Sequence, residues 1–217
     1  MVDDHPVVRR GLVQLINEEK DLWVCGQTGE ASEALELMRA ARPDVVILDV
    51  ELRGCSGLDL LLEIRAGYPG LPVLIFSMHD ERVYAERVLR AGAMGYLMKD
   101  EAGGEIVRGI RKVLQGEVCV SPAVSKKIVQ ELVENRSGPS GIEALSNQEL
   151  AVFTLIGKGL GPGEIAQRLH RSVKTIETYR GRIKRKLSLK SARELTQHAI
   201  QVGRFLGGSP PALSLQA

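Results

Sequence analysis

The chain has 217 residues, of which 44% are hydrophobic and 26% are charged, and this balance is typical of a soluble globular protein. Its longest apolar runs are far too short to cross a bilayer, and its start does not resemble a signal peptide, so we expect no membrane association. The three scattered cysteines lack metal-ligand spacing, which favours reduced thiols and a cytoplasmic location.

The formal net charge of +2 hides an uneven distribution along the chain. Residues 1–120 carry 14 basic and 20 acidic side chains, whereas residues 121–217 carry 15 basic and 7 acidic ones. An acidic half joined to a basic half indicates two domains with different partners, the basic one suited to a polyanion.

In the first half, short β-branched runs alternate with amphipathic helical runs. We predict strands at 21–29, 44–50, 71–80 and 95–100, and helices that begin near residues 6, 31, 57, 81 and 104. This alternation indicates βα units around a parallel sheet that is covered on both faces.

In the rest of the chain, the apolar periodicity predicts only helices. A helix over 122–134 leads into a linker at 136–141 that is rich in Ser, Gly and Pro. Four helical segments follow, at 147–159, 163–170, 172–187 and 191–202, and we expect the tail 207–217 to be disordered. The predicted domains are therefore 1–117, a helical linker 118–141, and a helical domain 142–206.

Polar side chains stand where the predicted strands end. They are Asp49, Ser77 and Lys99, with Asp3 and Asp4 after the short first run. Because open parallel sheets place their sites at the carboxyl ends of strands, we expect these groups to share one pocket. Three carboxylates there favour a bound Mg²⁺, beside which a carboxylate can attack phosphorus and form an acyl phosphate.

The first half resembles the receiver domain of two-component response regulators of the NarL/FixJ class through the motifs VDDHP, ILDV, FSMHD and GYLMKD. The resemblance implies an α/β flavodoxin-like doubly wound fold. It also implies roles for individual residues: Asp49 as phosphoacceptor, Asp3 and Asp4 as Mg²⁺ ligands with Asp49 and the backbone carbonyl of Glu51, Lys99 as a contact of the phosphoryl group, and Ser77 and Tyr96 as the switch pair.

Three features depart from that pattern, one of which is the bulky Met78 directly after Ser77. Arg53 stands where the family usually has Pro, and only Met1 and Val2 precede the acidic pair, so the first strand is truncated. The completeness of the downstream motifs favours a misassigned or trimmed start over a damaged receiver. His5 and His79 flank the pocket, and we expect both to be structural because two isolated histidines make a poor zinc site.

The basic half contains a helix pair joined by a short turn. Ser172 is suited to cap the second helix, and Val173, Ile176, Ile183 and Leu187 mark its buried side. Residues 171–190 hold eight basic side chains and one acid, Glu177. A short turn followed by a basic helix is typical of a helix-turn-helix that enters the major groove of DNA.

This half resembles the LuxR-type DNA-binding domain through LSxxEL, EIAxxL and TIExYRxxIxxKL, which implies an all-α four-helix helix-turn-helix domain. The resemblance assigns DNA contacts to Lys174, Thr175, Thr178, Tyr179 and Arg182, and a phosphate contact to Lys186. It implies double-stranded DNA, a sensor histidine kinase and a second copy of the chain as partners, with RNA polymerase as a further one.

The leading hypothesis is a transcription factor, not an enzyme, that is switched by Mg²⁺-dependent phosphorylation of Asp49. One alternative is an atypical regulator that binds DNA independently of phosphorylation through a degenerate receiver. Another is an aspartate-nucleophile hydrolase with Glu51 as acid/base, which leaves the basic helix unexplained.

Overall fold

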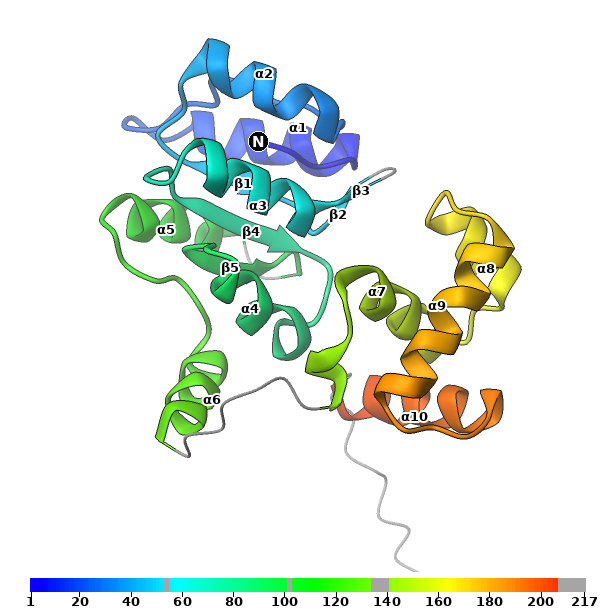
Figure 1. Ribbon diagram of the computed structural model, residues 1–217. Coiled ribbons are helices and arrows are strands. Elements are labelled where there is room, and N and C mark those ends of the chain that lie inside the picture. Colours follow the sequence, from blue (N-terminus) through cyan, green and yellow to red (C-terminus); the bar gives the residue numbers. More distant parts are fainter. Residues whose placement is uncertain (53–54, 101–102, 134–140, 207–217) are drawn as a thin grey trace, which may run out of the picture. The chain divides into compact units, whose positions relative to one another are not determined.

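The computed structural model describes residues 1–52, 55–100, 103–133 and 141–206 (Figure 1). The chain divides into two compact units, Met1–Ser137 and Gly138–Ala217. Among the described residues, no helix combines the length and apolar character needed to span a membrane. The expected disorder at 207–217 and most of the linker at 136–141 lie outside the described residues.

A parallel three-stranded sheet forms the centre of the first unit. Its order is β1 (Val46–Leu48), β4 (Val73–Ser77) and β5 (Gly95–Met98), with Leu48 beside Ile75 and Ile75 beside Tyr96. All residues of β1 and β4 are buried, as expected for strands covered on both faces. The predicted parallel sheet is confirmed.

Isolated backbone bridges extend this sheet at both edges. Val2 pairs in parallel with Leu48 on one side and with Thr28 on the other, and Cys119 pairs with Gly95 beyond β5. The short first run therefore occupies the position of an inner strand, although it contributes a single bridged residue there.

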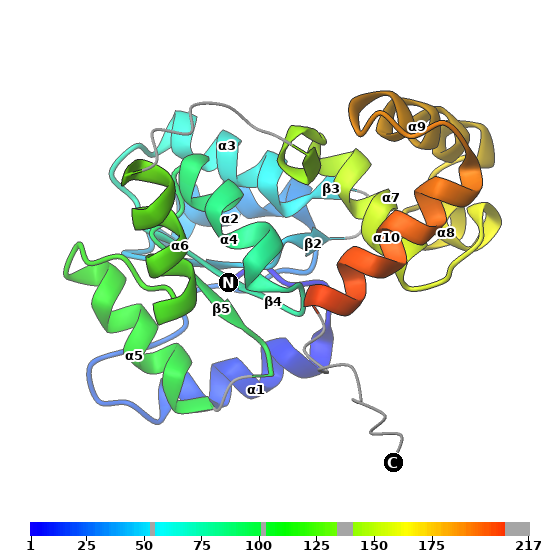
Figure 2. The same cartoon turned by 90° about the horizontal axis from the view of Figure 1, so that it is seen from below.

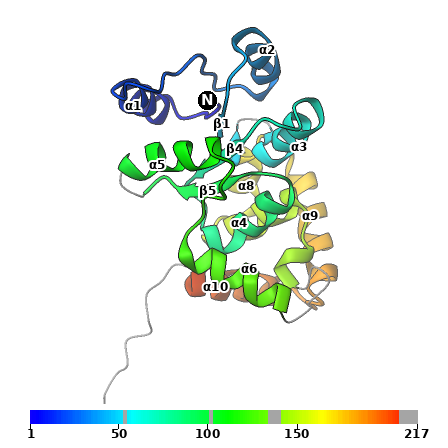
Figure 3. The same ribbon diagram turned by 90° about the vertical axis from the view of Figure 1, so that its left-hand side faces the viewer.

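Helices cover both faces of the sheet. Figures 2 and 3 show α1 (Pro6–Asn17) and α5 (Gly103–Leu114) on one face, with α3 (Gly57–Gly67) and α4 (Glu81–Arg90) on the other. Helix α2 (Ala31–Ala41) packs against α3. The core between the sheet and the first pair includes Leu12, Ile16, Ile47, Leu74, Phe76, Leu97, Ile106 and Ile110.

One prediction about strands was wrong, and one pair of strands was missed. Segment 21–29 forms no strand and contributes only the bridge at Thr28, and Trp23 is 74% exposed. A small antiparallel pair, β2 (Glu51–Leu52) and β3 (Cys55–Ser56), was not predicted. Among the described residues, the strand-type backbone hydrogen bonds of segment 21–29 join Gly26 and Thr28 to Met1 and Asp3, which are too few for a continuous ladder.

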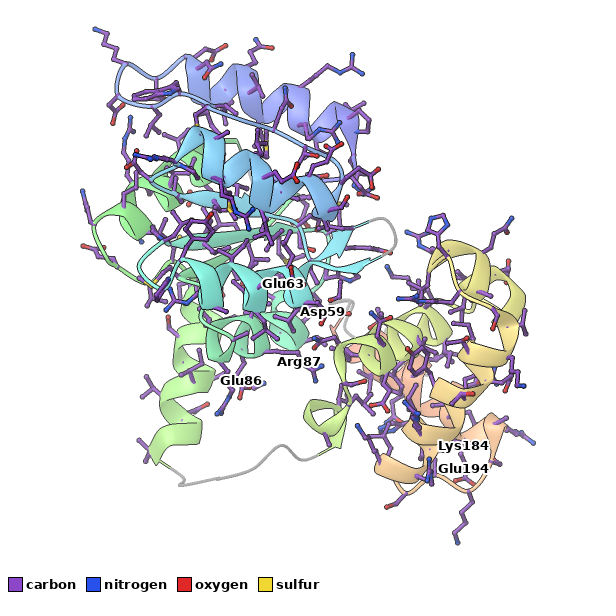
Figure 4. All side chains as sticks on the ribbon, turned by 45° about the horizontal axis from the view of Figure 1, so that its top comes forward. Asp59, Glu63, Glu86, Arg87, Lys184 and Glu194 are labelled. Carbon is purple, nitrogen blue, oxygen red and sulfur yellow. The ribbon has the colours of Figure 1, made fainter. Side chains whose placement is uncertain are left out.

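The predicted helix at 122–134 is present as α6 (Pro122–Val133) and packs against α4. Ser121 Oγ donates a 2.6 Å hydrogen bond to Glu81, and Lys127 Nζ lies 3.2 Å from Glu86, which Figure 4 labels. Val124 is buried. This helix therefore belongs structurally to the first unit.

In the described part of the second unit, residues 141–206, every regular element is a helix, which confirms the predicted class. A 3-10 turn, η1 (Gly141–Ala144), precedes α7 (Asn147–Gly157), α8 (Pro162–Arg168), α9 (Val173–Lys186) and α10 (Ala192–Leu206). Each helix contributes buried apolar residues to one core, among them Leu150, Phe153, Ile165, Ile176, Ile183, Leu195 and Ala199.

Candidate functional site

The backbone register of the sheet brings Asp3 and Asp49 together. Val2 pairs with Leu48, and its carbonyl accepts a 2.9 Å hydrogen bond from the Asp49 amide. The residues that follow, Asp3 and Asp49, therefore leave their strands side by side, and both are buried. Gly57 lets the start of α3 pack against the Asp49 backbone, because a Cβ there would collide with the Asp49 carbonyl oxygen.

Lys99 supplies a buried positive charge between the two carboxylates. Its amide donates to the carbonyl of Ser77, which fixes the end of β5 beside β4. Its Nζ lies 2.7 Å from Asp3 Oδ2 and 2.5 Å from Asp49 Oδ2, and all three side chains are at most 3% exposed. Two acids thus share one ammonium group, and a net negative charge remains.

The pKa of Asp49 is raised above its ordinary value. Burial is the largest cause, and the neighbouring charge of Asp3 acts in the same direction. Lys99 opposes this shift, as does the hydrogen bond from the Glu51 amide, which lies 3.3 Å from Asp49 Oδ1. A further cation at this position would stabilise the ionised carboxylate.

The acidic group is suited to a divalent metal ion. Asp3, Asp4, His5 and Asp49 each offer one ligand atom, and these atoms lie within 4.8 Å of one another. Carboxylate oxygens in this number match the preference of Mg²⁺ for hard oxygen ligands. His5, which we expected to be only structural, is part of the group, with Nδ1 2.7 Å from Asp4 Oδ1 and 3.3 Å from Asp3 Oδ1.

Ser77 and Tyr96 meet at the loop that follows β4. Ser77 is fully buried, and its Oγ lies 3.3 Å from the amide of His79. The buried Tyr96 donates from Oη to the His79 carbonyl at 2.7 Å, and burial raises the pKa of Tyr96 well above its ordinary value, so the phenol stays a donor. The His79 ring also contacts Glu51 at 3.2 Å and the ring of Tyr84 on α4. The loop therefore connects the pocket to α4.

In the second unit, α9 presents most of its predicted DNA-contacting side chains to solvent. Lys174, Thr178 and Arg182 are exposed, whereas Thr175 and Tyr179 are half-buried. The buried side consists of Ile176 and Ile183. Val173 was expected on that side, but it is 51% exposed because it occupies the first helical position, beyond the core of the domain.

Lys186 has a partner within its own domain. Its Nζ lies 2.6 Å from Glu149 Oε2 and 3.1 Å from the Ala144 carbonyl. Glu149 is buried and forms a capping box with Ser146 at the start of α7. The predicted phosphate contact of Lys186 stays a prediction, and the lysine also ties α9 to α7.

Comparisons with known proteins agree with this arrangement. Residues 1–111 match the response regulator receiver domain, and residues 143–199 match the luxR family of bacterial regulatory proteins. The chain is 35% identical to the oxygen regulatory protein NreC of Staphylococcus carnosus over 207 aligned residues. The aligned region covers 93% of this chain and 95% of NreC.

Two solved structures are also similar. A LuxR-family two-component response regulator from Aurantimonas sp. SI85-9A1 is 36% identical, with a TM-score of 0.56, over 61% of this chain and 94% of that one. Promoter-bound RcsB from Salmonella enterica serovar Typhimurium is 22% identical, with a TM-score of 0.62, over 92% of this chain and 96% of that one, and shows the shared fold.

The hydrolase alternative is not supported, because both matched families describe regulators. The matched ranges lie inside the predicted domains 1–117 and 142–206, whose boundaries remain predictions. The chain belongs to the two-component response regulators of the NarL/FixJ class, DNA-binding transcription factors that join a receiver domain to a LuxR-type helix-turn-helix domain.

Proposed function

We propose that phosphorylation of Asp49 by a sensor histidine kinase controls how tightly this regulator binds double-stranded DNA as a homodimer. The observation that carries the proposal is the position of Asp49 at the carboxyl end of β1, where it is buried and shares the ammonium group of Lys99 with Asp3. The expected cytoplasmic location and RNA polymerase as a further partner belong to the same proposal.

The chemistry is a phosphoryl transfer between two side chains. An Asp49 carboxylate oxygen attacks the phosphorus of a kinase phosphohistidine, the P–N bond breaks, and the imidazole leaves as an acyl phosphate forms. Asp3, Asp4, Asp49 and the carbonyl of Glu51 would hold Mg²⁺, which supplies positive charge that neutralises the phosphoryl oxygens when bound. Lys99 then exchanges its contact with Asp49 for one with a phosphoryl oxygen.

The path from the pocket to the linker runs through the β4–α4 loop. The Ser77 hydroxyl would turn toward the phosphoryl group, and Tyr96 would follow into the space that it leaves. In the structure, the Ser77 hydroxyl and the Tyr96 phenol are both hydrogen-bonded to the backbone of His79. Because His79 lies two residues before α4, their movement would displace the start of that helix. Ser121, directly before α6, and Lys127 within α6 are hydrogen-bonded to Glu81 and Glu86 of α4, so the displacement would move the linker helix as well.

The basic helix α9 is the DNA-binding element in this proposal, with Lys174, Thr175, Thr178, Tyr179 and Arg182 as contacts and Lys186 as a phosphate contact. A helix that follows a short turn can enter the major groove, and its cations release counterions from the phosphates. RcsB was solved bound to a promoter in the presence of the phosphomimetic BeF₃⁻. By analogy, that structure supports our proposal that phosphorylation is coupled to DNA binding.

The test is DNA affinity with and without phosphorylation. A duplex selected from a randomised pool would be titrated with the full chain by fluorescence anisotropy, before and after treatment with acetyl phosphate and Mg²⁺. We expect phosphorylation to tighten binding of the parent and to leave Asp49→Asn unchanged. Equal affinity of both proteins under both conditions would instead support a regulator that is independent of phosphorylation.

A further inference from the structure

One glycine inside α9 has no explanation in the packing of its own domain. A Cβ at Gly181 would meet nothing within 4 Å. In contrast, a Cβ at Gly157 in α7 would lie 2.7 Å from the Ala199 carbonyl oxygen, and one at Gly109 in α5 would lie 2.7 Å from Leu97. Glycine is unfavourable within a helix, and the open space around Gly181 gives no packing reason for it. Gly11 in α1 is open in the same way, so Gly181 gains significance only from its neighbours on α9.

The single acid of the basic segment lies one turn before this glycine. Glu177 precedes Gly181 by four residues, which places both on the same side of the helix. Its side chain is 56% exposed, and its carboxylate lies 3.8 Å from Arg180, too far for a hydrogen bond. Eight basic side chains surround it in the sequence, and Figure 4 labels one of them, Lys184.

A carboxylate on a surface that approaches DNA is repelled by the phosphates. That repulsion is offset where the carboxylate accepts a hydrogen bond from a base, and in the major groove the cytosine N4 amino group is the donor that suits an acid. A glycine beside it removes the side chain that would hold the helix away from the base edges.

We propose that Glu177 reads a cytosine in the major groove and that Gly181 lets this edge of α9 approach the bases closely. The proposal rests on the proposed function, because it requires α9 to be the DNA-binding helix. It adds a specificity-determining residue to the predicted contacts, which are otherwise neutral or basic.

The first test compares sequence preferences. The full chain, treated with acetyl phosphate and Mg²⁺, and its Glu177→Ala variant would each select duplexes from a randomised pool. We expect the parent to enrich a cytosine at one position in each half-site, and the variant to lose that preference by about fivefold or more while keeping the rest of the motif. An unchanged motif with uniformly tighter binding would show that the carboxylate only repels DNA, and would overturn the proposal.

The second test separates stability from binding. Gly181→Ala should raise the thermal unfolding temperature of the helical domain and weaken its affinity for the selected duplex. Gly11→Ala is the matched control, because Gly11 lies inside α1 and also has open space around it; it should leave DNA affinity unchanged. Equal affinity of Gly181→Ala and the parent would contradict close approach at this position.

Different results would contradict DNA binding by this chain and cytosine recognition by Glu177. If the parent shows no salt-dependent binding to any duplex, the proposed function fails. If the parent binds and selects a motif that neither variant alters, the proposed function stands and this inference is wrong.

Discussion

Lys99 and Asp49 form a buried ion pair, in which Nζ lies 2.5 Å from Oδ2, and the same ammonium group lies 2.7 Å from Asp3. The candidate phosphoacceptor is thus held by a cation of the protein itself. Since one ammonium group serves two buried carboxylates, the pocket retains a negative charge that favours a further cation.

Replacing Lys99 tests this charge balance. Lys99→Met leaves Asp3 and Asp49 buried without their shared cation, and we expect a loss of about 3–5 kcal/mol in the stability of the receiver domain. Mg²⁺ should raise the unfolding temperature of the variant more than that of the parent. Calorimetry with and without Mg²⁺ measures both effects. If Mg²⁺ raises the unfolding temperature of both proteins equally, Lys99 does not balance the charge of this pocket.

The raised pKa of Asp49 gives a pH dependence of stability. Between the unfolded and the higher folded pKa, the folded state binds more protons, so the contribution of Asp49 to stability falls as pH rises through that window. Asp49→Asn should therefore stabilise the receiver domain at pH 7, and the advantage should shrink as pH falls toward about 4, where the unfolded carboxyl also binds a proton. Thermal unfolding across pH checks this, and a variant less stable than the parent at pH 7 would refute it.

Tyr96→Phe tests the connection between the pocket and α4. The variant loses the hydrogen bond to the His79 carbonyl, and we expect a loss of about 1 kcal/mol in stability. Phosphoryl uptake should persist, whereas the gain in DNA affinity on phosphorylation should decrease. Tyr68→Phe, at a half-buried tyrosine after α3, is the control. An undiminished gain in Tyr96→Phe would remove this residue from the switch.

Glu149 makes the helical domain sensitive to acid. Burial, the largest influence, acts to raise the pKa of Glu149, but hydrogen bonds from Lys186 and from Ser146 outweigh it, and the pKa is lowered. The stability that it contributes is present above the unfolded pKa, near 4, and is lost as pH falls through the lower folded value.

Glu149→Gln should therefore cost about 1–3 kcal/mol at pH 7, with a smaller difference in acid. The matched control is Glu164→Gln, since Glu164 caps α8 in the same way but is exposed. Circular dichroism during heating measures both variants, and equal losses would show that the buried contact with Lys186 adds nothing.

Much of the pocket could be predicted because its residues stand immediately after buried strands. Asp49, Ser77 and Lys99 follow apolar runs that the structure buries, fully before Asp49 and Ser77 and up to Leu97 before Lys99. The sequence indicated that Met1 and Val2 form a truncated first strand, but a run this short has no periodic pattern to set its register. The pairing of Val2 with Leu48 sets Asp3 beside Asp49.

Contacts between elements distant in the sequence were also beyond prediction. The basic pattern of α9 marked Lys186 as a cation on a helix surface, but it carries no signal of the buried Glu149 that it contacts. Similarly, His5 offers no ligand spacing in the sequence, and only the register of the first run places its Nδ1 among the carboxylates.

The most direct test of the phosphorylation switch is the intact mass of the full chain after incubation with acetyl phosphate and Mg²⁺. We predict one phosphoryl adduct on the parent, and none on Asp49→Ala or on the parent treated with acetyl phosphate and a metal chelator. A folded parent that takes up no phosphoryl group, or an Asp49→Ala variant that takes up as much as the parent, would contradict the assignment of Asp49 as the phosphoacceptor.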